Sequence, residues 1–373
     1  MRRRIAHLPL HTGRAPAWLF ERMHRLAGSV VQLIVSDCGP AEMLSRLSDP
    51  IWFQAFGCVL GFDWHSSGLT TVTCGAIKEA YRRLGNDLGI RVAGGKGGAS
   101  RKTPQQIMTA AEQHGLDGDA LVYASRMSAK VDSAAVQDGY QIYTHHFFYS
   151  DRNEWCVVQQ GMNDDTGYAR RYHWLGDAVD NFVCEPHSGV ASVPARFDGL
   201  LNMVAQQACP ARTRSAELAR LHPDKLLREI TTGPSLFLPA HHPVGKHNIN
   251  PDRLGRILRM TYEHQPTDFS SLLGLAGVGP KTIRSLALLS ELIYGQPACN
   301  DDLTRQWTPA DPATFSYAHG GKDGHPFPVD RRTYDNSIRL LESAVRRARI
   351  DPTGKDQALF RLSAWTKNQP NAQ

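Results

Sequence analysis

The stretch LLGLAGVGPKTIRSLALL, residues 272–289, joins two helical patterns through a glycine-rich turn. Gly277 and Gly279 permit a hairpin whose backbone angles a residue with a Cβ adopts only at a cost. Pro280 suits the first turn of the following helix, where its fixed φ and missing N–H are both tolerated. The stretch therefore predicts two packed helices joined by a tight hairpin, with Lys281 at the start of the second helix.

The backbone of this hairpin is suited to bind an anion. N–H groups exposed at a tight turn and at the N-terminus of a helix attract negative charge. Helix-hairpin-helix elements use this geometry to hold a DNA phosphate without reading the base sequence. We therefore predict that Gly277, Val278 and Gly279 contact DNA; the alternative is a turn between packed helices that binds nothing.

The composition is that of a globular chain with a mild excess of positive charge. The 373 residues carry a net charge of +6, and 41% are hydrophobic. The length allows two domains, and the charge is compatible with nucleic acid as a partner. No apolar run approaches the ~18 residues of a membrane span, so we expect a cytoplasmic, nucleoid-associated protein. The seven scattered cysteines form no CxxC pair, which argues against a disulfide framework and a cysteine-held metal.

The residue pattern changes twice along the chain. Helical periodicity dominates roughly the first 120 residues. After them, YQIYTHHFFYS and EWCVVQQGM predict two strands joined at DRN, and ARRYHWLG predicts a third. Beyond a proline-containing stretch near residue 190, only helical patterns follow. We expect an α+β domain with a small antiparallel sheet at 1–190, then an all-α domain at 191–373 with an inserted loop at 299–326.

Two further motifs accompany the hairpin. In HPFPVDRRTYDNSIRLL, Pro-Val-Asp precedes a helical pattern and places Asp330 at or near its N-cap. In LLNMVAQQACPAR, the paired Gln206 and Gln207 interrupt a helical pattern that is otherwise apolar. Capping alone accounts for Asp330, and a capping carboxylate can also be catalytic.

The order of these motifs resembles the helix-hairpin-helix DNA glycosylase superfamily, the group of endonuclease III and 8-oxoguanine glycosylase, over roughly residues 195–373. The resemblance implies that Lys281 is the nucleophile of lyase members and Asp330 the catalytic carboxylate. It also implies that Gln206 or Gln207 fills the gap left by a flipped base. No cofactor is expected, because the cysteine cluster of endonuclease III has no counterpart in this sequence.

The spacing of the motifs departs from this superfamily. Lys281 and Asp330 are 49 positions apart, because the segment at 299–326 separates them, and the usual gap is much shorter. That segment is interpreted as a lid, a lesion-reading loop or a DNA clamp. Asp301 and Asp302 therefore remain competing candidates for the carboxylate.

The residue types suit base excision. A base must leave the duplex before an enzyme can reach it. Its departure puts positive charge on the sugar, which a carboxylate stabilises. A partly desolvated lysine amine then attacks the sugar and forms a Schiff base, whose collapse nicks the strand. We expect a DNA repair glycosylase with abasic-site lyase activity and double-stranded DNA as its partner.

Residues 1–190 resemble no glycosylase accessory domain. Segments such as DPIWFQAFGCVLGFDWHSSGLTT and VVQQGMN resemble an uncharacterised prokaryotic family, known as a domain of unknown function (number 763), over most of the chain. This family carries no activity with it. The glycine-rich GGKGGASRK presents Lys96, Arg101 and Lys102, which we predict to contact phosphates; the alternative is a solvated loop.

Two alternative functions remain. A metal-dependent nuclease would use the hairpin only to grip DNA, with ligands from the N-terminal half. The candidate ligands are His65, His145, His146, His173, His187, Asp63 and Glu185. Neighbours such as His145 and His146 point to opposite faces of a strand, and no close HxH or HxxxH spacing occurs, so we predict no metal. The second alternative is a non-catalytic, structure-specific DNA-binding protein in which Lys281 contacts a phosphate.

Overall fold

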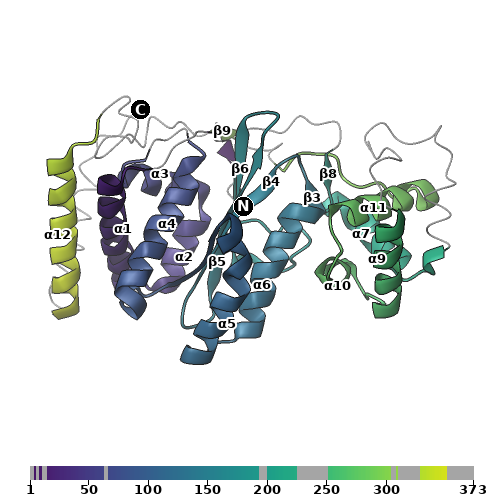
Figure 1. Cartoon of the computed structure of the whole chain (residues 1–373), viewed down its shortest axis with the longest axis horizontal. Coiled ribbons are helices and arrows are strands. Elements are labelled where there is room, and N and C mark those ends of the chain that lie inside the picture. Colours follow the sequence, from purple (N-terminus) through teal and green to yellow (C-terminus); the bar gives the residue numbers. More distant parts are fainter. Residues whose placement is uncertain are drawn as a thin grey trace.

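A central sheet with helices on both of its faces forms the framework of the protein (Figure 1). The computed structural model describes residues 4–5, 8–10, 15–62, 66–192, 200–224, 251–303, 308–309 and 328–350. This is the mixed architecture of helices and antiparallel strands that the sequence predicts. No helix within these ranges is long and apolar enough to cross a lipid bilayer.

Seven strands make up the sheet, in the order β2-β4-β5-β6-β7-β1-β9. They are β1 (Arg4–Ile5), β2 (Arg91–Lys96), β4 (Gln141–Tyr149), β5 (Trp155–Asn163), β6 (Tyr168–Leu175), β7 (Gly189–Ser192) and β9 (Thr308–Pro309). In this order, the neighbours among β2, β4, β5, β6 and β7 pair antiparallel. Strand β1 pairs parallel with both of its neighbours, β7 and β9. The three strands predicted around DRN are confirmed as β4, β5 and β6.

The glycine-rich segment begins within strand β2, which the sequence pattern does not predict. Gly94 and Gly95 pair with His146 and His145 of β4. Gly94 has φ +96°, and a Cβ there would lie 2.2 Å from the carbonyl oxygen of His145. Glycine is therefore needed for this close approach of two strands, although its presence is more typical of a loop.

One face of the sheet is covered by the N-terminal helices and by the last described helix. These are α1 (Ala17–Cys38), α2 (Pro40–Ser48), α3 (Pro50–Val59), the short η1 (Gly85–Leu88), α4 (Gly68–Leu84) and α12 (Arg331–Ile350). Asp49 is the N-cap of α3, and its side chain accepts hydrogen bonds from the backbone N–H of Ile51 (2.8 Å) and Trp52 (3.3 Å). The core of this face contains Phe53 and Tyr334, both fully buried.

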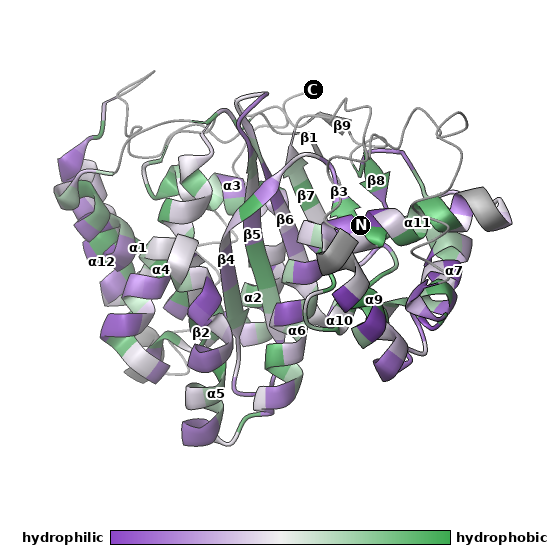
Figure 2. Ribbon diagram, turned by 45° about the vertical axis from the view of Figure 1, so that its right-hand side comes forward, coloured by the Kyte–Doolittle hydropathy of each residue, from purple (hydrophilic) through white to green (hydrophobic). Residues whose placement is uncertain are grey.

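The opposite face carries the remaining helices. Next to the sheet lie η2 (Gly97–Lys102), α5 (Thr103–His114), α6 (Gly118–Lys130), the π-helical turn η3 (Val131–Ala135) and η4 (Gly176–Ala178). A two-stranded ladder of β3 (Val136–Gln137) and β8 (Leu201–Asn202) follows. Beyond it are η5 (Gln206–Ala208), α7 (Cys209–Ala219), α9 (Pro251–His264), α10 (Phe269–Gly274) and α11 (Pro280–Tyr294). In Figure 2 the central strands and outer helices such as α12 both carry hydrophobic and hydrophilic residues.

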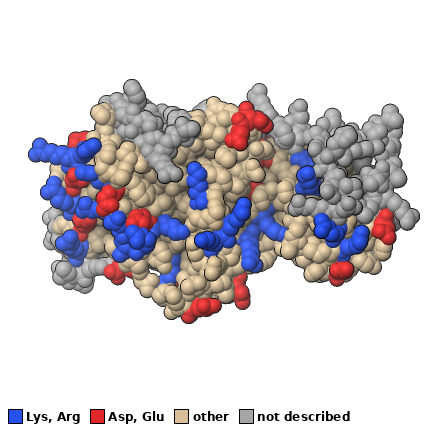
Figure 3. Space-filling model, viewed as in Figure 1, with Lys and Arg blue, Asp and Glu red and all other residues tan. Residues whose placement is uncertain are grey.

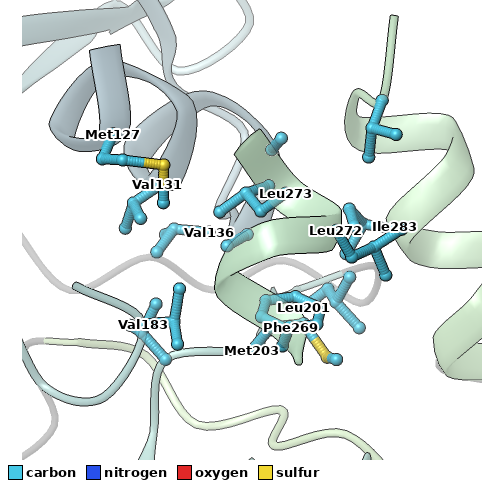
Figure 4. Close-up of a cluster of buried hydrophobic side chains, with 14 of the residues drawn as sticks. Met127, Val131, Val136, Val183, Leu201, Met203, Phe269, Leu272, Leu273 and Ile283 are labelled. Carbon is cyan, nitrogen blue, oxygen red and sulfur yellow. The ribbon is translucent and has the colours of Figure 1, made fainter. Parts of the chain in front are cut away.

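The hydrophobic core continues across residue 190, where the sequence suggested a domain boundary. That position lies inside β7, which pairs with β6. Phe269 and Leu272 of α10 belong to the same buried cluster as Val131 and Val136 (Figure 4). The C-terminal helices thus share their core with the sheet. Most of the predicted loop 299–326 lies outside the described residues.

Candidate nucleic-acid interface

The predicted hairpin is present between α10 and α11. Asp268 caps α10 by accepting a hydrogen bond from the backbone N–H of Ser271 at 2.7 Å. The helix ends at Gly274, and the turn that follows contains Gly277 at φ +85°. Gly279 precedes α11 and contributes no side-chain cap, so the first N–H groups of that helix are left to other acceptors.

A lysine from α6 holds the hairpin from its inner side. The Nζ atom of Lys130 donates to the carbonyl of Leu273 at 2.6 Å and to the carbonyl of Leu275, and it lies 3.5 Å from the carbonyl of Val278. Partial burial of this side chain lowers the pKa of Lys130. A cation at the C-terminal end of α10 is also favoured by the helix dipole.

A second anchor comes from Gln137, at the end of β3. Its Nε2 donates to the carbonyl of Pro280 at 2.8 Å, and its Oε1 accepts from Nε of Arg284 at 2.8 Å. The C=O and N–H of one trans peptide point in opposite directions. Because the carbonyls of Leu275, Val278 and Pro280 face Lys130 or Gln137, the N–H groups of the residues that follow them face away.

Three backbone N–H groups are therefore directed outward from the hairpin. They belong to Ala276, Gly279 and Lys281, of which Ala276 and Lys281 are exposed. Lys281 lies in the first turn of α11, so its side chain and these N–H groups meet at the positive end of the helix dipole. This arrangement is suited to an anion such as a phosphate.

The structure does not bring Asp330 to Lys281, and the predicted catalytic pair is corrected. Asp330 precedes α12, which packs on α1, whereas α11 lies at the other end of the molecule (Figure 1). Tyr334 donates to the carbonyl of Leu60 at 2.8 Å, and this contact belongs to the core on the far face of the sheet. Long-range packing of α12 therefore separates the two residues.

Asp330 is an N-cap. Its carboxylate accepts from the hydroxyl of Thr333 at 2.7 Å and from the backbone N–H of Arg332 (3.0 Å) and Thr333 (3.1 Å). The hydrogen bond from the Thr333 side chain is the main reason that the pKa of Asp330 is lowered. These hydrogen bonds of the exposed Asp330 carboxylate are all with residues in the first turn of α12.

Of the two competing carboxylates, that of Asp302 pairs with a buried arginine. Asp302 lies 2.9 Å from Nη2 of Arg170, whose Nη1 lies 2.6 Å from Asp138. Arg170 is fully buried, and Asp302 balances its charge. Asp301 accepts through its backbone carbonyl from Asn202 at 3.1 Å.

The sequence pattern suggested an α-helix around Gln206 and Gln207. In the structure both residues lie in the short turn η5. Asn202 accepts from the backbone N–H groups of Val204 and Ala205, which ends the preceding strand in a turn. Both glutamines are exposed, and Gln206 accepts from Sγ of Cys184 at 2.9 Å. They can reach a ligand only from this turn.

The basic glycine-rich segment is folded into β2 and η2. Lys96, Arg101 and Lys102 are all exposed. The Nζ of Lys96 lies 5.6 Å from the centre of the Tyr143 ring, within the range of a cation–π contact. Thr103 begins α5 and donates to the carbonyl of Ser100 at 2.6 Å. The three charges therefore extend from ordered backbone, one at the end of β2 and two in η2.

The candidate metal ligands do not converge. His145 hydrogen-bonds Ser125 at 2.9 Å and Gln159 at 2.7 Å, whereas the pKa of His146 is lowered to about 3, first by burial and then by His145 and Lys78. Across the described ranges, no group of three or more His, Cys, Asp or Glu side chains could hold a metal ion. Asp63 and His65 lie outside those ranges.

The sequence interpretation missed a buried polar network around Asp132, in the π-helical turn. Asp132 accepts from Nε1 of Trp174 at 2.9 Å and from Gln159, and lies 2.5 Å from Nε2 of His187. Polar pairs inside apolar strands, such as the glutamines of VVQQGM, were the available signal. The stretch 130–138 therefore connects this network to the hairpin through Lys130 and Gln137.

Together these features define a mixed α/β protein with a helix-hairpin-helix unit packed against helical segments, including α6 and η3, that lie on one face of its sheet. The chain matches the family described as "Protein of unknown function (DUF763)" over residues 4–329, and it belongs to that family. No curated protein and no solved structure matches it. Asp330 and α12 lie beyond the matched residues, whereas the hairpin lies within them.

Proposed function

We propose that this protein binds the sugar–phosphate backbone of double-stranded DNA through its hairpin. One observation carries the proposal: Lys130 and Gln137 hold the hairpin carbonyls inward, which turns the N–H groups of Ala276, Gly279 and Lys281 outward beside an exposed amine. Such donors recognise a phosphate and no particular base. We therefore expect little base-sequence preference and a strong dependence of affinity on salt.

Base removal has less support than binding. A glycosylase needs a carboxylate at the reacting sugar, and Asp330 and Asp302 are engaged elsewhere. The resemblance to the glycosylase superfamily thus rests on the hairpin.

An abasic-site lyase is the second candidate, favoured by the exposure of the Lys281 amine at the hairpin. At an abasic sugar, this amine would add to the C1′ aldehyde and lose water to form a Schiff base. Loss of a C2′ proton would then expel the 3′ phosphate. Hydrolysis would return the amine, so the reaction needs no added oxidant or metal.

The test compares Lys281→Ala with wild type on a fluorescent duplex across a range of salt concentrations. Loss of one phosphate contact should weaken binding and lower the slope of log K against log salt by about 0.9. Arg82→Ala is the matched control, because Arg82 is exposed but paired with Glu79 at 2.7 Å. Its slope should equal that of wild type.

Borohydride trapping on an abasic duplex, in EDTA, separates the two candidates. A covalent adduct that is lost in Lys281→Ala would establish the lyase. Binding without any adduct would leave the non-catalytic function. Failure of the wild type to bind duplex DNA at low salt would contradict both.

A further inference from the structure

The exposed basic side chains on the face shown in Figure 3 fall into two groups, which differ in whether acidic side chains lie among them. Lys and Arg gather across its centre, over the region of α5 and α6, while towards the α1 and α12 side basic and acidic side chains are interleaved. Contacts explain the second group: Arg22 pairs with Asp335 at 2.8 Å, and Arg83 pairs with Glu79 at 2.9 Å. Those charges are already balanced.

The exposed basic residues of β2, η2 and α6 differ in their partners. They are Lys96, Arg101, Lys102 and Arg126. Within the part of the chain that the structure describes, none of the four forms an ion pair. We call these four residues the basic track. Their charges are available to an external polyanion.

Contacts connect the basic track to the hairpin. Arg126 precedes Lys130 by four residues on α6, so the two lie on the same side of the helix, one turn apart. Lys130 in turn holds the hairpin carbonyls. The amine of Lys130 is bonded to the hairpin carbonyls. Arg126, one turn away on α6, is exposed and is therefore the nearest charge of α6 to the hairpin that a ligand can reach.

The connection continues from α6 to the sheet. Ser125 hydrogen-bonds His145 at 2.9 Å, and the neighbour of His145, Thr144, pairs with Lys96 in the ladder of β2 and β4. Arg101 and Lys102 follow Lys96 directly in η2. The track thus comprises one residue of α6, one turn from Lys130, and three residues at the end of β2 and in η2, before α5.

We infer that one DNA duplex occupies both the hairpin and the basic track, with Arg126, Lys96, Arg101 and Lys102 contacting further phosphates of its backbone. This inference rests on the proposed function. Duplex DNA carries one charge for every ~1.7 Å of its axis, so a group of exposed cations that form no ion pair is complementary to it. The track supplies affinity and orientation, and the hairpin supplies the fixed phosphate site.

The experiment measures the salt dependence of duplex binding for wild type, Arg126→Ala, and a triple variant, Lys96→Ser with Arg101→Ser and Lys102→Ser. The slope should fall by about 0.9 for Arg126→Ala and by up to about 2.7 for the triple variant, which loses three contacts. The matched control is Arg82→Ser with Arg83→Ser, two exposed arginines paired with Glu79. It should keep the wild-type slope.

Duplex length provides a second measurement. The triple variant and wild type should bind equally well to a duplex too short to pass the hairpin, and should diverge as the duplex lengthens. A difference that persists at every length, or an equal loss in the control, would show a general charge effect and overturn the track.

The inference and the proposed function fail in distinguishable ways. If Lys281→Ala lowers the slope and the track variants do not, the hairpin binds DNA and the track is wrong. If wild type does not bind, the proposed function itself is wrong. Because the substituted residues are exposed, unchanged thermal melting should accompany each track variant.

Discussion

The charged amine of Lys130 is hydrogen-bonded within the protein and needs no ligand as a partner. Its Nζ faces the carbonyls of Leu273, Leu275 and Val278, so it acts on DNA binding only through the hairpin. It is a positioning residue, unlike Lys281, whose side chain is exposed. The two lysines should therefore differ in the salt dependence that they confer.

Lys130→Met keeps the aliphatic stem and removes the donor. Hydrogen bonds from a charged group contribute about 1.5–3 kcal/mol, so loss of hairpin order should weaken DNA binding by about tenfold or more. The slope of log K against log salt should stay near the wild-type value, because Lys130 itself contacts protein carbonyls and no phosphate. Lys130→Arg, which keeps the charge and donors, is the control; a reduced slope in Lys130→Met would contradict the positioning role.

Asp330→Ala tests the capping role of that residue. Its carboxylate has a lowered pKa in the folded protein, so its stabilisation is present above the ordinary pKa and is lost as pH falls through the folded value. At neutral pH the variant should melt at a slightly lower temperature than wild type, and the difference should narrow in acid. Duplex binding and borohydride trapping should be unchanged; loss of an adduct would return Asp330 to the catalytic role.

At the scale of elements, the sequence predicts what depends on local chemistry. Aromatic and β-branched runs identified β4, β5 and β6, and the glycine spacing identified the hairpin with Gly277 at positive φ. Strand β2 was missed because Gly94 and Gly95 usually indicate a loop, whereas they here allow close contact with β4. The turn η5 was missed because a side-chain cap from Asn202 overrides an apolar helical pattern.

The position of α12 could not be predicted from sequence. Its apolar stripe could pack on any complementary surface, and motif order suggested the hairpin helices. Asp335 contacts Arg22 of α1, and Tyr334 contacts Leu60, which follows α3. These contacts, with residues more than 270 positions earlier in the chain, determine where α12 packs. Pairing of Lys281 with Asp330 was inferred from a resemblance of sequence order, which does not determine long-range packing.

At the scale of the whole molecule, the C-terminal helices depend on the first half of the chain. Phe269, Leu272 and Ile283 are buried in one cluster with Val131 and Val136 (Figure 4). Exposing a side chain of this size to water costs about 1.5–3 kcal/mol. A few such exposures equal the whole stability of an ordinary domain.

Residues 191–373 expressed alone should therefore fail to fold. Circular dichroism should show no cooperative melting, and limited proteolysis should degrade the fragment faster than the same segment in the full chain. Mixing it with residues 1–190 is the control, and should restore protection. A fragment that melts cooperatively by itself would show that the two halves have separate cores.

The nine residues from Lys130 to Asp138 have a consequence for how this chain tolerates changes in its length. Lys130 and Gln137 contact the hairpin, while Asp132 contacts the buried network and Asp138 pairs with the buried Arg170. The four residues lie within one short stretch, from the last residue of α6 to the residue after β3. One inserted or deleted residue would rotate half of these side chains away from their partners. Natural variants of this protein should accept insertions in exposed connections, such as the turn between β4 and β5, and reject them here.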